Sequence, residues 1–114
     1  IMNSRDKGAR GEREARDELK KVLGCEARRG QQFSGGKDSP DVVHSIEGVH
    51  IEVKRTETFN AYKAMKQAVN DAGEQVPVVM HRKNNQEWLL VCRFKDLPKL
   101  ASRIHFHCIE KATT

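Results

Sequence analysis

Two strand-like segments joined by an amphipathic helical segment constrain the fold of this chain more than any other feature. Residues 49–55 and residues 76–81 are short apolar runs typical of strands. Between them, residues 56–72 repeat apolar side chains at the helical period, with Thr58 or Asn60 as the cap and Gly73 as the stop. A strand, a helix and a strand in this order predict two parallel strands with a right-handed connection.

The segments on either side complete an α/β pattern. Residues 4–23 carry an apolar stripe at the helical period and end at Gly24, and residues 25–29 and 41–46 resemble strands. Residues 87–93 form a further strand-like run after a turn at residues 84–86, and residues 95–101 predict a short helix. The predicted order is α-β-β-β-α-β-β-α, a mixed central sheet flanked by helices. We expect residues 102–114 to be a flexible tail.

Length and charge limit the possible classes of protein. The 114 residues fit a single domain, residues 1–114. The formal charge of +5 favours a polyanionic partner such as nucleic acid, although many soluble proteins carry a similar charge. No apolar run approaches the roughly 18 residues of a membrane helix, so we expect a soluble, cytoplasmic protein, in the host cytoplasm if the gene is viral. The 3 cysteines are widely spaced, which predicts buried or free thiols.

A predicted hairpin brings charged side chains together. Glu47-Gly48 suits a tight turn between residues 41–46 and 49–55. The register of such a hairpin sets Val43 opposite Glu52 and Asp41 opposite Lys54. Alternation then places apolar residues on one face of the hairpin. The predicted apolar face comprises Val42, His44, Ile46, Val49, Ile51 and Val53. The other face carries Asp41, Glu52 and Lys54.

This second face has the chemistry of phosphodiester hydrolysis. Asp41 and Glu52 are oxygen ligands of the kind that Mg²⁺ takes, and Lys54 can orient a water and stabilise developing negative charge. We expect Mn²⁺ to substitute for Mg²⁺. The alternative is that Asp41 caps a strand while Glu52 and Lys54 form an exposed ion pair. Glu18-Leu19-Lys20 has the same spacing but lies on a helix, where residues two apart point in different directions.

Glu12 interrupts the apolar stripe of residues 4–23. A buried carboxylate is costly unless it is paired. A helix packed over the face of Asp41 and Glu52 would direct Glu12 toward the same metal ion as a third carboxylate. The alternative is that Glu12 lies where the stripe emerges from the core and is solvated.

These motifs resemble those of a known group of enzymes. Ser39-Pro40-Asp41 followed by Glu52-Val53-Lys54 resembles the PD-(D/E)XK nuclease superfamily. Within it, residues 7–14, the pair Arg28-Arg29 and the loop Phe33-Ser34-Gly35-Gly36 resemble archaeal-type Holliday junction resolvases and similar phage proteins, over about residues 7–94.

The resemblance implies a restriction-endonuclease-like core and a metal site made of Glu12, Asp41 and Glu52, with Lys54 as a further catalytic residue. It also implies a serine in the loop that assists resolution. Ser34 matches this serine best, and Ser39 is a weaker match. Related nucleases often carry a glutamine on the following helix. Gln67 is in place, but the helical wheel puts it on the polar side, so we expect it to be solvated.

The sequence therefore predicts a metal-dependent, structure-specific endodeoxyribonuclease, most simply a Holliday junction resolvase that acts on branched DNA as a homodimer. A nicking, repair or restriction-type nuclease is an alternative, and so is a non-catalytic DNA-binding module on the same fold. No membrane or nucleotide cofactor is expected. Basic residues bordering the site are the expected phosphate contacts. They are Lys7, Arg10, Arg13, Arg28, Arg29, Lys37 and Arg55.

Two further groups of residues carry weaker expectations. Apolar residues near the last strand and helix are candidates for the dimer surface, the alternative being that they close the core. These residues are Trp88, Leu90, Phe94 and Leu97. His105-Phe106-His107-Cys108 offers metal-ligating side chains, but we expect it to belong to the flexible tail rather than to a metal site.

Overall fold

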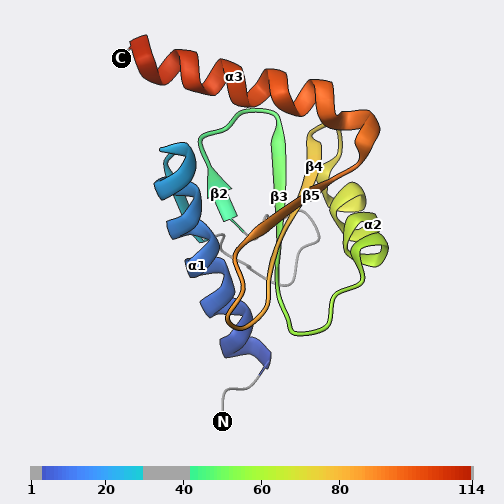
Figure 1. Cartoon of the computed structure of the whole chain (residues 1–114). Coiled ribbons are helices and arrows are strands. Elements are labelled where there is room, and N and C mark those ends of the chain that lie inside the picture. Colours follow the sequence, from blue (N-terminus) through green and yellow to red (C-terminus); the bar gives the residue numbers. More distant parts are fainter. Residues whose placement is uncertain (1–3, 30–41, 114) are drawn as a thin grey trace.

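The chain alternates helices and strands in the predicted α-β-β-β-α-β-β-α order (Figure 1). The structure is a computed structural model that describes residues 4–29 and 42–113, with side chains described for residues 8–27 and 42–110. Its elements are α1 (Ser4–Leu23), β1 (Ala27–Arg29), β2 (Val42–His44), β3 (Val49–Arg55), α2 (Ala61–Ala72), β4 (Val76–Arg82), β5 (Leu89–Cys92), the short 3₁₀ helix η1 (Phe94–Asp96) and α3 (Leu97–Thr113).

The central sheet has the strand order β3-β4-β5. β3 and β4 are parallel, with Glu52 beside Val79, and β5 returns antiparallel to β4. The predicted strand, helix and strand crossover is therefore confirmed. β1 and β2 form a separate antiparallel pair that lies next to β3. The result is a mixed α/β structure.

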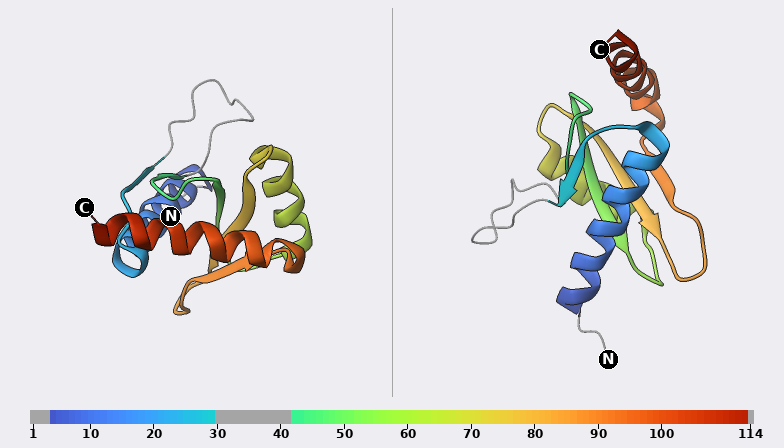
Figure 2. Two further views of the ribbon diagram at one scale, coloured as in Figure 1. Left: turned by 90° about the horizontal axis from the view of Figure 1, so that it is seen from above. Right: turned by 90° about the vertical axis from the view of Figure 1, so that its left-hand side faces the viewer.

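Helices cover both faces of this sheet (Figure 2). Ala15 and Leu19 of α1 join a core that includes Ile51 and Val53 of β3, on the face formed by the odd-numbered residues of that strand. α2 packs on the opposite face, where Ala68 contacts the cluster around Val79 of β4. The paired residues Glu52 and Val79 share a face, so Glu52 lies on the α2 side of the sheet.

α2 begins, and α1 and α2 end, as their sequences indicate. Asn60 is the N-cap of α2, and its side-chain oxygen accepts a hydrogen bond from the backbone N–H of Lys63 at 3.0 Å. Gly73 ends α2 with a φ of 60°, and Gly24 follows α1 with a φ of 63°, a left-handed conformation that favours glycine. The predicted caps and stops are confirmed, with Asn60 rather than Thr58 as the cap.

Gly11 lets α1 approach β3 very closely. A Cβ atom added to Gly11 would clash with Cβ of Arg55, at a separation that real Cβ atoms do not show. The helix can therefore cross β3 at this height only because residue 11 has no side chain. Glu14, one turn further along α1, is ion-paired with the same arginine. α1 is thus fixed beside the end of β3, one residue beyond Lys54.

The predicted hairpin between β2 and β3 is wrong. Within the described residues, Val43 pairs with Arg28 of β1, and Glu52 pairs with Val79 of β4. Hydrogen bonds with side chains hold the turn that follows β2, and the chain does not continue as a hairpin. Ile46 N–H donates to Nδ1 of His44 at 3.1 Å, and Ser45 exchanges hydrogen bonds of 2.9 Å with Glu26. The predicted apolar face is nevertheless right for the core residues Val42, Ile46, Val49, Ile51 and Val53.

The predicted flexible tail over residues 102–114 is also wrong, because α3 continues to Thr113. Leu100, Ile104 and His107 fall on one side of this helix at helical spacing. Leu100 and His107 are buried, and Ile104 packs against the core. The helix lies across the end of the sheet near the loop between β2 and β3 (Figure 1), where Gly48 is adjacent to Arg103. The single-domain prediction remains an expectation.

None of the helices in the described part of the chain combines the length and apolarity that a membrane span requires.

Candidate active site

One face of β3 presents polar side chains to α2. His50, Glu52 and Lys54 alternate with the core residues Ile51 and Val53 and therefore point to the α2 side. The first two are buried, with 4% of each side chain exposed, whereas Lys54 keeps 30% of its side chain exposed. The strand thus carries a buried carboxylate and, two residues on, an ammonium that reaches solvent. The alternative of an exposed ion pair between Glu52 and Lys54 therefore does not hold for Glu52.

Glu52 lies between two basic groups. Its Oε1 is 3.8 Å from Nζ of Lys54, and its Oε2 is 3.5 Å from Nε2 of His50. A buried carboxylate is stable only when cations or donors compensate for its lost hydration. The site therefore contains a carboxylate whose two oxygens face different partners along the same strand.

Lys54 is held by a second contact that the sequence did not predict. Its ammonium donates a hydrogen bond of 2.9 Å to Oε1 of Gln67 on α2. The expectation that Gln67 is merely solvated is therefore wrong, although the residue is exposed. The helical wheel showed only that Gln67 lies off the core stripe, whereas the long side chain of Lys54 extends from the strand to reach it.

Glu12 is buried, with 8% of the residue exposed, so the alternative that it is solvated is wrong. The prediction that α1 packs over the face of Glu52 is also wrong. α1 packs on the face of Ile51 and Val53, opposite to Glu52, and does not lie over the Glu52 face. Its neighbours Gly11 and Glu14 both meet Arg55 at the end of β3. Glu12 therefore belongs to the part of α1 that borders this strand end.

Several predicted site residues lie outside what the structure describes. Asp41, Ser34, Ser39 and Lys37 fall within residues 30–41, and the side chains of Lys7, Arg28 and Arg29 are also outside the described set. Their assigned roles remain expectations.

Among the predicted phosphate contacts, Arg10 and Arg13 are exposed on α1. Arg10 lies 3.3 Å from the carboxylate of Glu14 and keeps 63% of its side chain exposed. Both residues are thus accessible to a phosphate backbone, and Arg10 lies near the end of β3 because Glu14 also pairs with Arg55.

Arg55 has a different environment from these two. Only 10% of its side chain is exposed, and it donates to Glu14 at 3.0 Å and to Asn84 at 2.8 Å. Arg82 joins the same carboxylate of Glu14 at 2.7 Å, and Glu57 lies 3.5 Å from Arg55. These contacts tie α1, β3 and β4 together. They do not favour Arg55 as a phosphate contact, and they give Arg82 a structural role.

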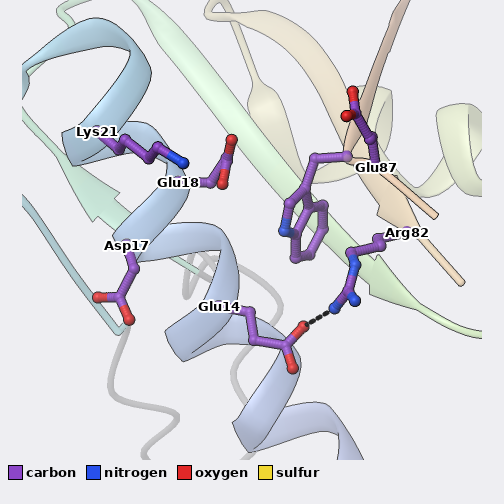
Figure 3. Close-up of a pocket in the computed structure, with 7 residues that line it drawn as sticks. Glu14, Asp17, Glu18, Lys21, Arg82 and Glu87 are labelled. Atoms are coloured by element: carbon purple, nitrogen blue, oxygen red, sulfur yellow. Dashed lines mark hydrogen bonds and ion pairs between the residues drawn. The ribbon is translucent and has the colours of Figure 1, made fainter. Parts of the chain in front are cut away.

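A pocket of about 460 Å³ lies between α1 and the β4–β5 hairpin (Figure 3). It is lined by Glu14, Asp17, Glu18, Lys21, Arg82, Glu87 and Trp88. Carboxylates outnumber cations in this lining, which disfavours a phosphate backbone. The pocket is on the α1 side of the sheet and does not contain the polar residues of β3.

His44 lies at the end of β2 in a partly buried position. Burial lowers the pKa of His44, the nearby imidazoles of His50 and His107 lower it further, and a backbone hydrogen bond with Val49 acts in the opposite direction. The imidazole is therefore biased toward its neutral form, in which Nδ1 can accept the hydrogen bond from Ile46.

The fold and the glutamate-lysine pair on β3 define a nuclease of the PD-(D/E)XK superfamily. The chain belongs to the family described as "Phage putative PDDEXK endonuclease", whose model matches residues 3–113. Among solved structures, it is similar to Hjc of Archaeoglobus fulgidus, described as a Holliday junction resolvase from an archaeal hyperthermophile. The two share 26% identity with a TM-score of 0.55, over 75% of this chain and 72% of the other. Comparison with curated proteins gives no match.

Membership of this family makes the chain an endonuclease, and such nucleases generally use divalent metal ions. Glu52 is a buried carboxylate, which is an oxygen ligand of the kind that hard divalent cations take. The chemistry of this ligand therefore fits a divalent metal ion.

Proposed function

We propose that the chain is a Mg²⁺-dependent, structure-specific endodeoxyribonuclease that cuts four-way DNA junctions as a homodimer. The observation that carries the proposal is the placement of Lys54, whose ammonium lies 3.8 Å from the Glu52 carboxylate and 2.9 Å from the Gln67 amide oxygen. The likeness to Hjc of A. fulgidus, described as a Holliday junction resolvase, supports four-way junctions as the substrate.

In this proposal, Glu12, Asp41 and Glu52 would hold the ion. Bound Mg²⁺ supplies charge neutralisation at the scissile phosphate and lowers the pKa of a water molecule. Lys54 orients the attacking water and stabilises the negative charge that develops on the phosphate oxygens. Gln67 limits the rotation of the Lys54 side chain and keeps its ammonium near Glu52. Ser34 is proposed to assist resolution.

Arg10 and Arg13 are proposed to bind the arms of the junction through phosphates, together with Lys7, Arg28, Arg29 and Lys37. Such contacts supply affinity without reading bases. Recognition would then depend on the shape of the branched substrate. Mn²⁺ is expected to replace Mg²⁺.

The test is a cleavage assay with metal titration on three substrates: a four-way junction, a flap and a plain duplex. Asp41→Asn, Glu52→Gln and Lys54→Ala should each reduce junction cleavage to below about 1% of the wild-type rate, because removing a single transition-state contact costs about 10²–10³-fold. Folding and junction binding should persist. Efficient cleavage of the plain duplex would favour a restriction-type or nicking nuclease. Binding without cleavage under any divalent metal would favour a non-catalytic DNA-binding module.

A further inference from the structure

A second group of metal-ligating side chains lies beside the catalytic pair. His50 precedes Glu52 by two residues on the same face of β3, and Asp71 comes from the last turn of α2, which covers that face. One ligand atom from each of the three lies within 4.8 Å of the others. The three residues come from two elements that are packed together, so the fold itself sets their spacing.

His50 has an unusual environment. Its side chain is 96% buried, since 4% is exposed, and its Nε2 has no hydrogen-bond partner in the described part of the chain. This nitrogen is 3.5 Å from Oε2 of Glu52, which is a distance for charge interaction rather than a formed hydrogen bond. A buried polar atom left unsatisfied destabilises the folded state. Within the described residues, this buried nitrogen without a partner belongs to a side-chain group that also offers two carboxylates, and a bound metal ion would satisfy it.

Glu52 can serve this group and the catalytic centre together. Its Oε1 faces Lys54 at 3.8 Å, and its Oε2 faces His50 at 3.5 Å. The two oxygens thus point along the strand in opposite directions. One remains available to the proposed catalytic ion, while the other is directed into the group formed with His50 and Asp71.

We propose that His50, Glu52 and Asp71 bind a divalent transition metal ion, with Zn²⁺ as the best fit, at a site that shares only Glu52 with the proposed Mg²⁺ site. Imidazole nitrogen suits Zn²⁺ and related ions, whereas Mg²⁺ prefers oxygen ligands only. One nitrogen and two carboxylates give Zn²⁺ three protein ligands, a number that leaves a position for water. The inference concerns binding and does not depend on the nuclease reaction. The competing explanation is a direct interaction between His50 and Glu52, which requires no metal.

The test is titration of the metal-free full-length chain with Co²⁺, followed by its visible d–d absorption, and with Zn²⁺ by calorimetry. Asp41→Asn serves as the background, because it weakens the proposed Mg²⁺ site while leaving all three ligands of the new one. In this background we expect one ion bound per chain, with a nitrogen and oxygen ligand spectrum. Zn²⁺ should also raise the melting temperature, because it binds the folded state.

Two variants then examine the ligands. Asp71→Asn and His50→Gln should each weaken Zn²⁺ binding by at least about tenfold. A loss of about tenfold in metal affinity is already typical when a residue that only hydrogen-bonds to a metal ligand is changed. His105→Ala and Cys108→Ser are matched controls, because both change exposed ligand-type residues on α3 and should leave binding unchanged.

Three results would overturn the proposal: no Co²⁺ spectrum in the Asp41→Asn background, unchanged binding in Asp71→Asn, or loss of binding in Cys108→Ser. Asp71→Asn is the decisive variant if His50→Gln unfolds, because Asp71 is only partly buried. Failure here leaves the nuclease proposal intact, since that proposal is tested separately by cleavage in the Glu52→Gln and Lys54→Ala variants.

Discussion

Lys54 shows how a single side chain acquires its position from two elements. The strand brings it beside Glu52, and the hydrogen bond to Gln67 on α2 fixes the far end of its flexible stem. A lysine has many rotamers, and most of them would move its ammonium away from the carboxylate. Gln67 is therefore a positioning residue for Lys54 rather than a group that acts on the phosphate.

Gln67→Ala should lower kcat by about tenfold with little change in KM, because a hydrogen bond to a charged group contributes about 1.5–3 kcal/mol and each 1.4 kcal/mol is a factor of ten. The exposure of Gln67 places the effect near the lower end of that range. Asn70→Ala is the matched control, an exposed polar residue on the same helix. Single-turnover cleavage rates measure both. An unchanged rate, or a loss as large as that of Lys54→Ala, would contradict the positioning role.

The sequence predicted which residues form this site, but it did not predict which side chains these residues contact. Glu52-Val53-Lys54 could be placed on a strand face, because alternation in strands is a strict geometric rule. The partner of Lys54 could not be predicted, because contacts between exposed long side chains depend on how far α2 lies from β3. His50 and Asp71 of the proposed Zn²⁺ site were missed because their proximity also depends on how α2 packs on β3. The one signal for His50 was its position two residues before Glu52 on the same strand face.

At the scale of the element, α1 is positioned by the close approach of Gly11 to β3 and by the ion pairs of Glu14. Gly11 removes the side chain where the helix crosses Arg55, and Glu14 binds both Arg55 and Arg82. The helix is thereby attached to β3 and β4 at the end of the sheet that carries Lys54.

Gly11→Ala should destabilise the fold by about 1–3 kcal/mol, the usual cost of overpacking a tight contact. Gly8→Ala is the matched control on the same helix, because nothing lies within 4 Å of an added Cβ there. It should stabilise by about 0.5–1 kcal/mol, because alanine is the better helix former. Urea unfolding with an unchanged m-value measures both. Equal effects of the two variants would show that the approach of α1 to Arg55 is not tight.

The connection between β2 and β3 depends on His44 in its neutral form. The pKa of His44 is lowered in the folded chain, chiefly by burial. The unfolded chain, in which the pKa of histidine is about 6.5, therefore binds protons first as the pH falls. The contribution of His44 to stability is fully present above about pH 6.5 and is lost progressively below it.

His44→Asn should reduce this acid sensitivity, because an asparagine side-chain oxygen can replace Nδ1 as the acceptor for Ile46 N–H but does not titrate. The measurement is the free energy of unfolding at about pH 8 and about pH 5.5, on either side of the range where histidine titrates. His105→Asn, a change of an exposed histidine on α3, is the control. If His44→Asn loses as much stability on acidification as the wild type, another group is responsible.

Helices, strands and caps were predicted correctly where local sequence patterns determine them. The prediction failed where one strand had two possible neighbouring strands. The strand, helix and strand crossover followed from local periodicity, and Asn60 and Gly73 follow from local backbone chemistry. The hairpin failed because β2 had two possible neighbours, and Ser45 bonds to Glu26 beside β1 instead. The extent of α3 was missed because its buried side, which includes Leu100 and His107, is narrow and polar in part.

At the scale of the whole molecule, acidic, basic and exposed apolar side chains lie in different regions. The acidic pocket between α1 and the β4–β5 hairpin disfavours DNA, whereas the exposed arginines Arg10 and Arg13 of α1 favour it. A third region is apolar. Phe94 is 88% exposed, Leu89 is 61% exposed, and Leu90 and Leu97 are about half exposed. Trp88, by contrast, packs partly against the core and is no longer a candidate for this surface.

These exposed apolar side chains lie on β5, which is an edge strand of the described sheet, and on the segment that follows it. Large apolar groups clustered in one region often mark an interface between proteins. A four-way junction has near two-fold symmetry, and resolution requires two matched cuts, whereas each chain carries one glutamate-lysine pair of the proposed catalytic kind. A two-fold homodimer through this region would supply the second active site.

Phe94→Glu combined with Leu97→Glu should therefore convert a dimer into a monomer, as measured by light scattering at micromolar protein. Lys95→Glu and Lys99→Glu form the matched control, because they change charge on exposed neighbours without removing apolar surface.

The mechanism is tested by mixing active chains with Glu52→Gln chains. Heterodimers should nick a junction once, in the strand that the active chain faces, while wild-type dimers cut both strands. The monomeric variant should lose paired cutting but retain single nicks. A wild-type chain that is strictly monomeric and still makes paired, symmetric cuts would contradict the dimer, and would remove the main reason to prefer a resolvase over a nickase.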